Sequence, residues 1–192
     1  AYQLTKQKTI SKTSRSNTFL IDPLVTTGTA NDNDYKGSNY DRGHLAPAAD
    51  MGWSVLSMKE SFYYSNMSPQ VPAFNRGIWK KLEELVRKWA VENEQIYIVT
   101  GPILTADLPT IGTNKVSVPL AYYKVILDYS LPQIKAIGFI IPNKKSTQAL
   151  TDYIVSVDEV EKITGIDFFS QLPDNQEAII ERTVCKSLWT WH

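Results

Sequence analysis

Residues 75–91 read NRGIWKKLEELVRKWAV and have the clearest periodicity in the chain. The apolar residues of this stretch recur every three or four positions, which is the spacing of one face of an α-helix. They are Ile78, Trp79, Leu82, Leu85, Val86, Trp89 and Ala90. We therefore predict a helix from Asn75 to about Val91, and we expect its tryptophans to lie in the core rather than to stack on bases.

Apolar segments on both sides of this helix indicate the rest of the fold. Runs rich in β-branched and aromatic residues predict strands at 62–67, 95–99, 116–127 and 134–141, with Pro119 interrupting the third. Residues 146–155 and 157–163 are expected to be helical, and Gly165 ends the second of these helices. Strands paired through short connections with helices between them indicate an α+β fold with a largely antiparallel central sheet flanked by helices.

The composition limits the class of protein. The 192 residues suit a single domain, 1–192, and no stretch reaches the roughly 18 apolar residues that a membrane span needs. Twenty Lys and Arg balance twenty Asp and Glu, so bulk charge alone would not hold a nucleic acid and any polyanion site must be local. The acids are unevenly placed, since residues 158–181 carry seven of them. Cys185 is the only cysteine, which excludes an internal disulfide.

The best candidate for chemistry is a histidine that precedes the predicted helix. Only two histidines occur, and His44 lies in the segment DRGHLAPAAD of residues 41–50. An imidazole can accept a proton from water near neutral pH, and Gly43 beside it allows the backbone a close approach. The alternative for a lone histidine is a structural role, but Asp41 and Arg42 in the same four residues favour a functional site.

The predicted helix adds further polar candidates. Asn75 would most often be an N-cap, although its amide oxygen is also a suitable Mg²⁺ ligand. On a straight helix Glu83 would lie about 12 Å beyond Asn75 and about 80° around the axis. Arg87 follows one turn later on the same face, where an ordinary surface ion pair with Glu83 is the alternative to a role in a site.

Arginines near these residues could bind phosphate, because the guanidinium group matches the geometry of phosphate oxygens. They are Arg15, Arg42, Arg76 and Arg87. Each one taken alone could equally be a solvated surface charge.

Taken together, these motifs resemble the DNA/RNA non-specific endonuclease family, the ββα-metal or His-Me finger group that includes Serratia nuclease and endonuclease G. The resemblance rests on Asp41-Arg42-Gly43-His44, on residues 62–72, on Asn75 and on residues 79–83. It continues through residues 99–102, 118–125 and 164–169 and so covers most of the chain. The motif DRGH followed by an asparagine 31 residues later and a glutamate eight residues beyond is a specific pattern.

The resemblance implies a role for each matching residue. His44 matches the general base, with its ring oriented by a backbone carbonyl, and Asn75 matches the direct ligand of a catalytic Mg²⁺, which Mn²⁺ could replace. Glu83 matches the acid that binds the metal through water, and Arg87 an arginine near the scissile phosphate. Arg42 matches the arginine of the motif and is a further catalytic candidate. The substrate-binding or supporting candidates are Arg15, Asp41, Asn66 and Arg76.

The implied activity is hydrolysis of DNA and RNA to 5′-phosphate and 3′-hydroxyl ends with low sequence specificity. A secreted or periplasmic bacterial enzyme is expected, with a mitochondrial one as the alternative, and an inhibitor protein and a homodimer are possible partners. Two other readings stay open. One is a metal-dependent phosphodiesterase with a smaller substrate, which the neutral charge allows, and the other is a non-catalytic nucleic-acid-binding domain.

Overall fold

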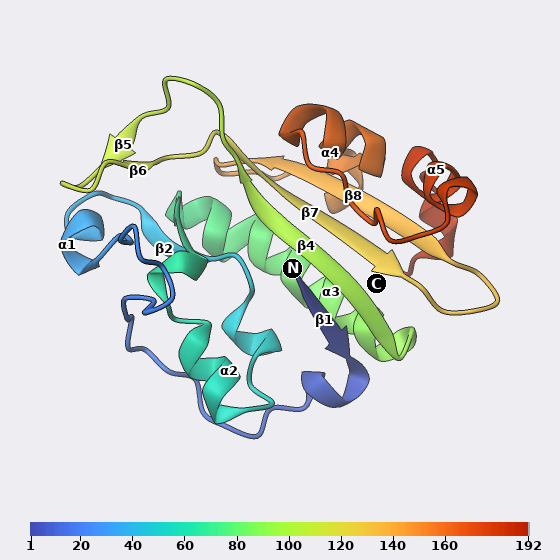
Figure 1. Cartoon of the computed structure of the whole chain (residues 1–192), viewed down its shortest axis with the longest axis horizontal. Coiled ribbons are helices and arrows are strands. Elements are labelled where there is room, and N and C mark those ends of the chain that lie inside the picture. Colours follow the sequence, from blue (N-terminus) through green and yellow to red (C-terminus); the bar gives the residue numbers. More distant parts are fainter. Residues whose placement is uncertain (192) are drawn as a thin grey trace.

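The computed structural model describes residues 1–191, and a five-stranded antiparallel sheet runs through its centre (Figure 1). The strand order is β1-β4-β7-β8-β9. These strands are β1 (Tyr2–Thr5), β4 (Gln95–Ile103), β7 (Ala121–Asp128), β8 (Lys135–Pro142) and β9 (Ile154–Val155). The expected α+β class with a largely antiparallel sheet is therefore confirmed.

Helices cover the two faces of this sheet. The long helix α3 (Lys80–Glu92) contacts β1 and β4, whereas α4 (Val157–Thr164) and α5 (Asp174–Arg182) contact β8. Side chains alternate between faces along a strand, so in β7 Ile126 joins the core under α3 and Val125 joins the core under α4 and α5. The sheet thus separates α3 from the two C-terminal helices (Figure 1).

A β-hairpin stands beside the start of the long helix. Strand β2 (Asp41–His44) pairs antiparallel with β3 (Met67–Gln70), and His44 lies opposite Met67. The intervening segment contains α2 (Val55–Glu60). The smaller elements α1 (Asp32–Tyr35), β5 (Thr110–Ile111) and β6 (Val116–Ser117) lie at the same side of the molecule (Figure 1). Two strands followed by a helix are the ββα arrangement that the resemblance implies.

The long helix confirms the periodicity, but its beginning differs from the prediction. Residues Phe74–Trp79 form a wide π-type turn, and Gly77 leaves helical geometry with φ −108° and ψ −110°. Asn75 lies inside this turn rather than at the N-cap, so the expected straight path from Asn75 to Glu83 is wrong. Trp79, Leu82, Val86 and Trp89 are buried as predicted.

The other predicted elements have mixed outcomes. Strands at 95–99, 116–127 and 134–141 are confirmed, with the second broken around Pro119, and Gly165 ends α4 in a left-handed conformation. The strand predicted at 62–67 is wrong, because residues 64–66 form a 3₁₀ turn and the strand begins at Met67. The helix predicted at 146–155 is also wrong, since only a short 3₁₀ turn at 150–153 precedes β9. No helix within residues 1–191 is both long enough and apolar enough to cross a membrane.

Candidate active site

His44 and its predicted partners surround one open pocket of about 490 Å³ between the hairpin and the long helix. The lining residues are Arg15, Phe19, Arg42, His44, Pro47, Ala48, Ala49, Asn75, Arg76, Lys80, Glu83 and Arg87. The structure therefore brings together the predicted base, the predicted metal-binding residues and all four candidate arginines. Asp41 and Asn66 do not line this pocket.

The hairpin places His44 through a tight contact between its two strands. The side chain of the fully buried Gln70 packs against the backbone of Gly43, and a Cβ atom at Gly43 would lie 2.1 Å from that side chain. Only glycine fits this position without displacing Gln70. The glycine of the DRGH motif thus lets β2 and β3 approach closely next to the histidine.

Aromatic rings surround the imidazole of His44. The ring of Phe62 meets it edge to face at 4.6 Å, and Phe19 lies at 6.2 Å. The Nε2 atom of His44 is buried and has no hydrogen-bond partner within residues 1–191, so the orienting backbone carbonyl that we expected is not found at this nitrogen. Packing against Phe62 holds the ring instead.

Burial also determines the charge of His44. Desolvation, aided by the nearby Arg15 guanidinium, lowers the pKa of His44 to about 4. The imidazole is therefore neutral at pH 7 and has a free lone pair with which it can accept a proton.

Asn66 braces the loop that follows His44. Its side-chain oxygen accepts from the amide of Ala46 at 2.9 Å, and its side-chain nitrogen donates to the carbonyls of Ala46 and Ser61 at 2.9 and 2.8 Å. The amide of Leu45 donates to the backbone oxygen of Asn66 at 2.9 Å. These bonds give Asn66 a positioning role, and its predicted contact with substrate stays a prediction.

Asn75 is oriented by Asp41 rather than by the backbone. The Nδ2 atom of Asn75 donates to Asp41 Oδ2 at 2.8 Å, and Arg76 adds two bonds to the same carboxylate at 2.8 and 2.6 Å. This contact fixes which end of the amide is the donor, so the opposite end, Oδ1, is available to a cation. Asp41, expected to contact substrate, is already shared between Asn75 and Arg76.

Glu83 lies in the pocket beside a lysine that the motif analysis did not identify. Desolvation raises the pKa of Glu83 to about 7, although the charge of Lys124 opposes this shift. Lys124 is fully buried in β7, its Nζ lies 4.8 Å from the centre of the Trp79 ring, and it has no hydrogen-bond partner within residues 1–191. The only signal in the sequence was one lysine inside an apolar strand.

Arg87 is held by an acid from the motif loop. It forms a salt bridge with Asp50, whose side chain is 1% exposed, and Tyr2 donates its hydroxyl to the same carboxylate at 2.7 Å. The surface ion pair between Glu83 and Arg87, considered from the sequence, is absent from the salt bridges of residues 1–191. Asp50 and Tyr2 could not be found from spacing, because Tyr2 comes from the first strand.

Two further arginines lie over aromatic rings at the pocket. The guanidinium of Arg15 lies 5.1 Å from the centre of the Phe62 ring, and that of Arg42 lies 4.4 Å from the Phe19 ring. Arg42 also pairs with Asp32 at 3.0 Å. Rings under a guanidinium restrict its position while leaving its N–H groups free for an anion.

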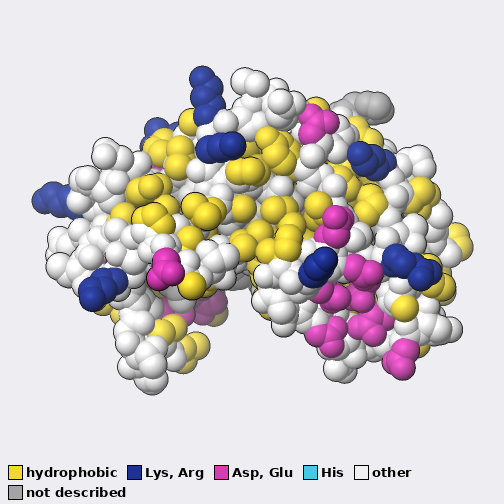
Figure 2. All heavy atoms as spheres, turned by 90° about the horizontal axis from the view of Figure 1, so that it is seen from above, with side chains coloured by type: hydrophobic (Ala, Val, Ile, Leu, Met, Phe, Trp, Pro, Cys, Tyr) yellow, Lys and Arg dark blue, Asp and Glu magenta, His cyan; other side chains and the backbone are white. Residues whose placement is uncertain are grey.

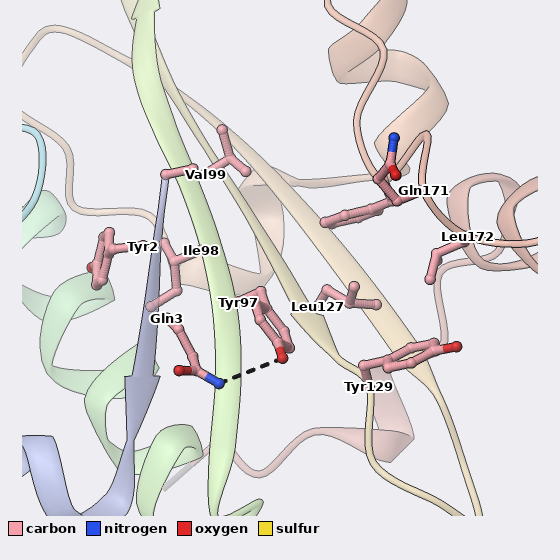
Figure 3. Close-up of a pocket in the computed structure, with 11 residues that line it drawn as sticks. Tyr2, Gln3, Tyr97, Ile98, Val99, Leu127, Tyr129, Gln171 and Leu172 are labelled. Atoms are coloured by element: carbon pink, nitrogen blue, oxygen red, sulfur yellow. Dashed lines mark hydrogen bonds between the residues drawn. The ribbon is translucent and has the colours of Figure 1, made fainter.

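A second pocket, of about 500 Å³, has a different character. It lies between β1, β4 and the segment around Leu172, and tyrosines and aliphatic side chains line it (Figure 3). The polar contact drawn there joins Gln3 Nε2 to the Tyr97 hydroxyl at 3.4 Å (Figure 3). Its lining has no charged side chain, so the His44 pocket is the candidate active site.

A β-hairpin that carries a neutral histidine is followed by a turn with an asparagine and a helix with a glutamate, which is the ββα arrangement expected for this class of nuclease. The sequence matches the model of the DNA/RNA non-specific endonuclease family over residues 1–175. The chain belongs to this family.

Individual relatives agree with this assignment. Mitochondrial endonuclease G of Bos taurus is 36% identical over 148 residues, which cover 70% of this chain and 50% of that protein. A nuclease of Nostoc sp. is 36% identical over 160 residues, covering 78% of this chain and 58% of that protein. The chain thus spans about half the length of the curated relatives that it matches.

A solved structure supports the fold. A chain of an EndoG/EndoGI complex, described as showing the mechanism of EndoG inhibition, has a TM-score of 0.82 and 30% identity to this chain. The match covers 91% of this chain and 78% of that one.

Proposed function

We propose that this chain hydrolyses phosphodiester bonds of DNA and RNA as an endonuclease with low sequence specificity. The observation that carries the proposal is the shared pocket, in which neutral His44, Asn75 and Glu83 face a space bordered by four arginines. Membership of the endonuclease family supports it. Because these side chains suit phosphate and metal rather than base edges, they supply no readout of sequence.

In this proposal His44 is the general base. Its Nε2 is enclosed by protein, so Nδ1 is the nitrogen that we assign to the attacking water. His44 takes one proton, the water oxygen bonds to phosphorus, and the bond from phosphorus to the 3′ oxygen breaks. The departing oxygen gains a proton from solvent, which leaves 5′-phosphate and 3′-hydroxyl ends.

Asn75 would bind the metal ion directly, and Glu83 would bind it through water. An amide oxygen and a carboxylate are donors that suit a hard cation, and Asp41 already orients the amide of Asn75. Mg²⁺ fits a site with few protein ligands, and Mn²⁺ could replace it. When bound, such an ion supplies charge stabilisation to the phosphoryl oxygens as a Lewis acid.

The arginines would bind the phosphate groups. Arg15 and Arg42, fixed over aromatic rings, would contact phosphates on the side of the hairpin, and Arg87 would approach the scissile phosphate from the helix. Arg76 is largely exposed and already bound to Asp41, so we assign it to the edge of the substrate path. A phosphate beside Arg15 would also relieve the repulsion that this arginine exerts on protonated His44.

We further propose that residues 1–192 form one endonuclease domain that acts outside the cytosol. One relative is named mitochondrial and another comes from a bacterium, so a mitochondrial location and a secreted or periplasmic one are both consistent with the family. We propose an inhibitor protein as a partner, because the matched solved structure is a complex described as showing EndoG inhibition. A homodimer is the proposed assembly to test.

The test is digestion of supercoiled plasmid and of single-stranded RNA by the purified chain with Mg²⁺ and with EDTA. We expect cleavage of both substrates with Mg²⁺ and none with EDTA. His44→Ala should lower turnover by about 10²- to 10⁴-fold, the contribution typical of a general base. His192→Ala, which removes the only other histidine, is the matched control and should cleave normally.

Binding of a non-cleaved oligonucleotide should persist in His44→Ala. Equal loss of binding and turnover would contradict the role as base. Absence of cleavage by the intact chain with either Mg²⁺ or Mn²⁺ would favour a smaller phosphodiester substrate or a binding-only domain.

A further inference from the structure

The C-terminal helices carry a concentration of acids away from the active site. Asp158 and Glu161 on α4 and Glu181 on α5 each place a carboxylate oxygen within 4.8 Å of the others. Figure 2 shows acidic side chains gathered on the side of the molecule where α4 and α5 lie. We call these three residues the α4–α5 acid cluster.

Glu181 distinguishes this cluster from an ordinary acidic surface. Glu181 is only 6% exposed, and its Oε1 atom is buried without a hydrogen-bond partner within residues 1–191. Buried carboxylates normally have a hydrogen-bonding or cationic partner, since burial without one is costly. The atom therefore points to a missing cationic partner.

Protein cations do not fill this role. None of the salt bridges among residues 1–191 includes a member of the α4–α5 acid cluster. One oxygen of Glu161 accepts the amide of Phe168 at 2.7 Å, which holds that carboxylate in place and leaves its second oxygen available. The cluster is thus partly preorganised by the chain yet not neutralised by it.

We propose that the α4–α5 acid cluster binds one Ca²⁺ ion, which links α4 to α5. Carboxylate oxygens alone select a hard cation, and three carboxylates from two helices exceed the one or two that Mg²⁺ usually takes. Ca²⁺ accepts six to eight oxygens in a flexible geometry, so waters can complete its shell on the exposed side of Asp158. The site is separate from the His44 pocket, because the sheet lies between α3 and these helices.

The electrostatics of Glu181 agree with a cation site. Desolvation, followed by repulsion from Glu161, Glu177 and Asp158, raises the pKa of Glu181 to about 8. A divalent cation would offset both effects, because it favours the ionised form of each carboxylate around it.

Calorimetric titration with Ca²⁺ tests the proposal directly. The starting protein is Asn75→Ala, in which the proposed catalytic metal site is disabled, so that the heat reports the α4–α5 acid cluster. We expect one Ca²⁺ per chain. Adding Glu181→Gln should weaken Ca²⁺ binding by at least about tenfold. Mutation of residues that only hydrogen-bond to a metal ligand already causes a loss of this size, and Glu181 is proposed to be a ligand itself. Glu84→Gln, on the exposed side of α3, is the matched control and should bind as before.

Thermal unfolding gives a second measurement that does not depend on nuclease activity. Ca²⁺ at about 100 times its Kd should raise Tm by roughly 5–10 °C in a chain of this size. If Glu181→Gln fails to fold, Asp158→Asn takes its place as the test variant. Asp158 is exposed, so this substitution removes a ligand without disturbing the core, and it should reduce the rise in Tm. When Glu181→Gln and Asp158→Asn are each introduced singly into the parent chain, which retains Asn75, nuclease activity with Mg²⁺ should be unchanged.

Three results would overturn the proposal. They are no bound Ca²⁺ in Asn75→Ala, equal binding by Glu181→Gln and the control, and a Tm that does not respond to Ca²⁺. Failure of the nuclease assay alone would contradict the proposed function and leave the Ca²⁺ site standing.

Discussion

The His44 pocket and the α4–α5 acid cluster are both built from charged side chains, but only the pocket contains salt bridges. In the pocket Asp50 holds Arg87, Asp41 holds Arg76, and Asp32 holds Arg42. None of the three carboxylates of the cluster forms a salt bridge with a basic residue within residues 1–191. Paired charges give a rigid site that receives an anion without rearrangement, whereas unpaired acids require a cation from outside. The difference predicts opposite responses to the removal of a charge.

The largest effect is expected from breaking the buried pair of the pocket. Arg87→Met should destabilise the protein by about 3–5 kcal/mol, because Asp50 would remain buried without its cation. Urea unfolding at pH 7 measures the change. The double variant Arg87→Met/Asp50→Asn should recover much of the loss, since the uncompensated charge is then gone. If the single variant is as stable as the parent, the pairs of the pocket do not have the structural role assigned to them.

The buried histidine should make stability depend on pH. The pKa of His44 is about 4 in the folded chain and about 6.5 when unfolded, so between these values only the unfolded chain binds the proton. Stability is therefore fully present above pH 6.5 and is lost as pH falls towards 4, by about 3 kcal/mol at most. Urea unfolding of metal-free protein at pH 7.0 and 4.5 measures this loss. His44→Ala should show a smaller loss than His192→Ala, and identical losses would exclude His44 as the cause.

A smaller effect should follow from loosening the support of Asn75. Asp41→Asn removes the charge that holds the Asn75 amide, and we expect the Mg²⁺ concentration for half-maximal cleavage to rise by about 10- to 100-fold. The maximal rate at saturating Mg²⁺ should change less. Asp32→Asn is the control, because it removes a carboxylate that pairs with Arg42 and does not contact Asn75. Equal shifts in both variants would mean that general charge, rather than orientation of Asn75, sets the metal requirement.

The features of the fold and of the pocket that depend on local sequence pattern could be predicted. The long helix follows from apolar spacing, and the pocket residues follow from the DRGH motif with Asn75 and Glu83 at fixed distances along the chain. The kink at Gly77 does not follow, because the apolar spacing continues through it. Residues 62–66 have strand-like composition, yet the contacts of Asn66 with Ala46 and Ser61 hold them in a turn.

Contacts between residues that are distant in the sequence could not be predicted from local pattern either. Tyr2 meets Asp50 across 48 residues, and the charge of Lys124 on β7 acts on Glu83 on the long helix. For the acid cluster, the seven acids of residues 158–181 were visible as a bias in composition. Packing of α4 against α5 was needed to bring three of them within one coordination shell.

The smallest expected effect is a change in the free energy of unfolding whose sign differs between an unpaired acid of the cluster and a paired acid elsewhere. In metal-free buffer at pH 9, above the raised pKa of Glu181, the charge of this residue lies in the last turn of α5, where the helix dipole disfavours an acid. Glu181→Gln should therefore raise the free energy of unfolding by about 0.3–1 kcal/mol. Glu84→Gln removes the salt bridge with Lys80 and should lower the free energy of unfolding by about 0.3–0.5 kcal/mol. Adding Ca²⁺ should reverse the order of parent and Glu181→Gln, because only the parent then gains the bound ion. A Glu181→Gln protein less stable than the parent without Ca²⁺ would mean that the cluster is already satisfied by the chain itself.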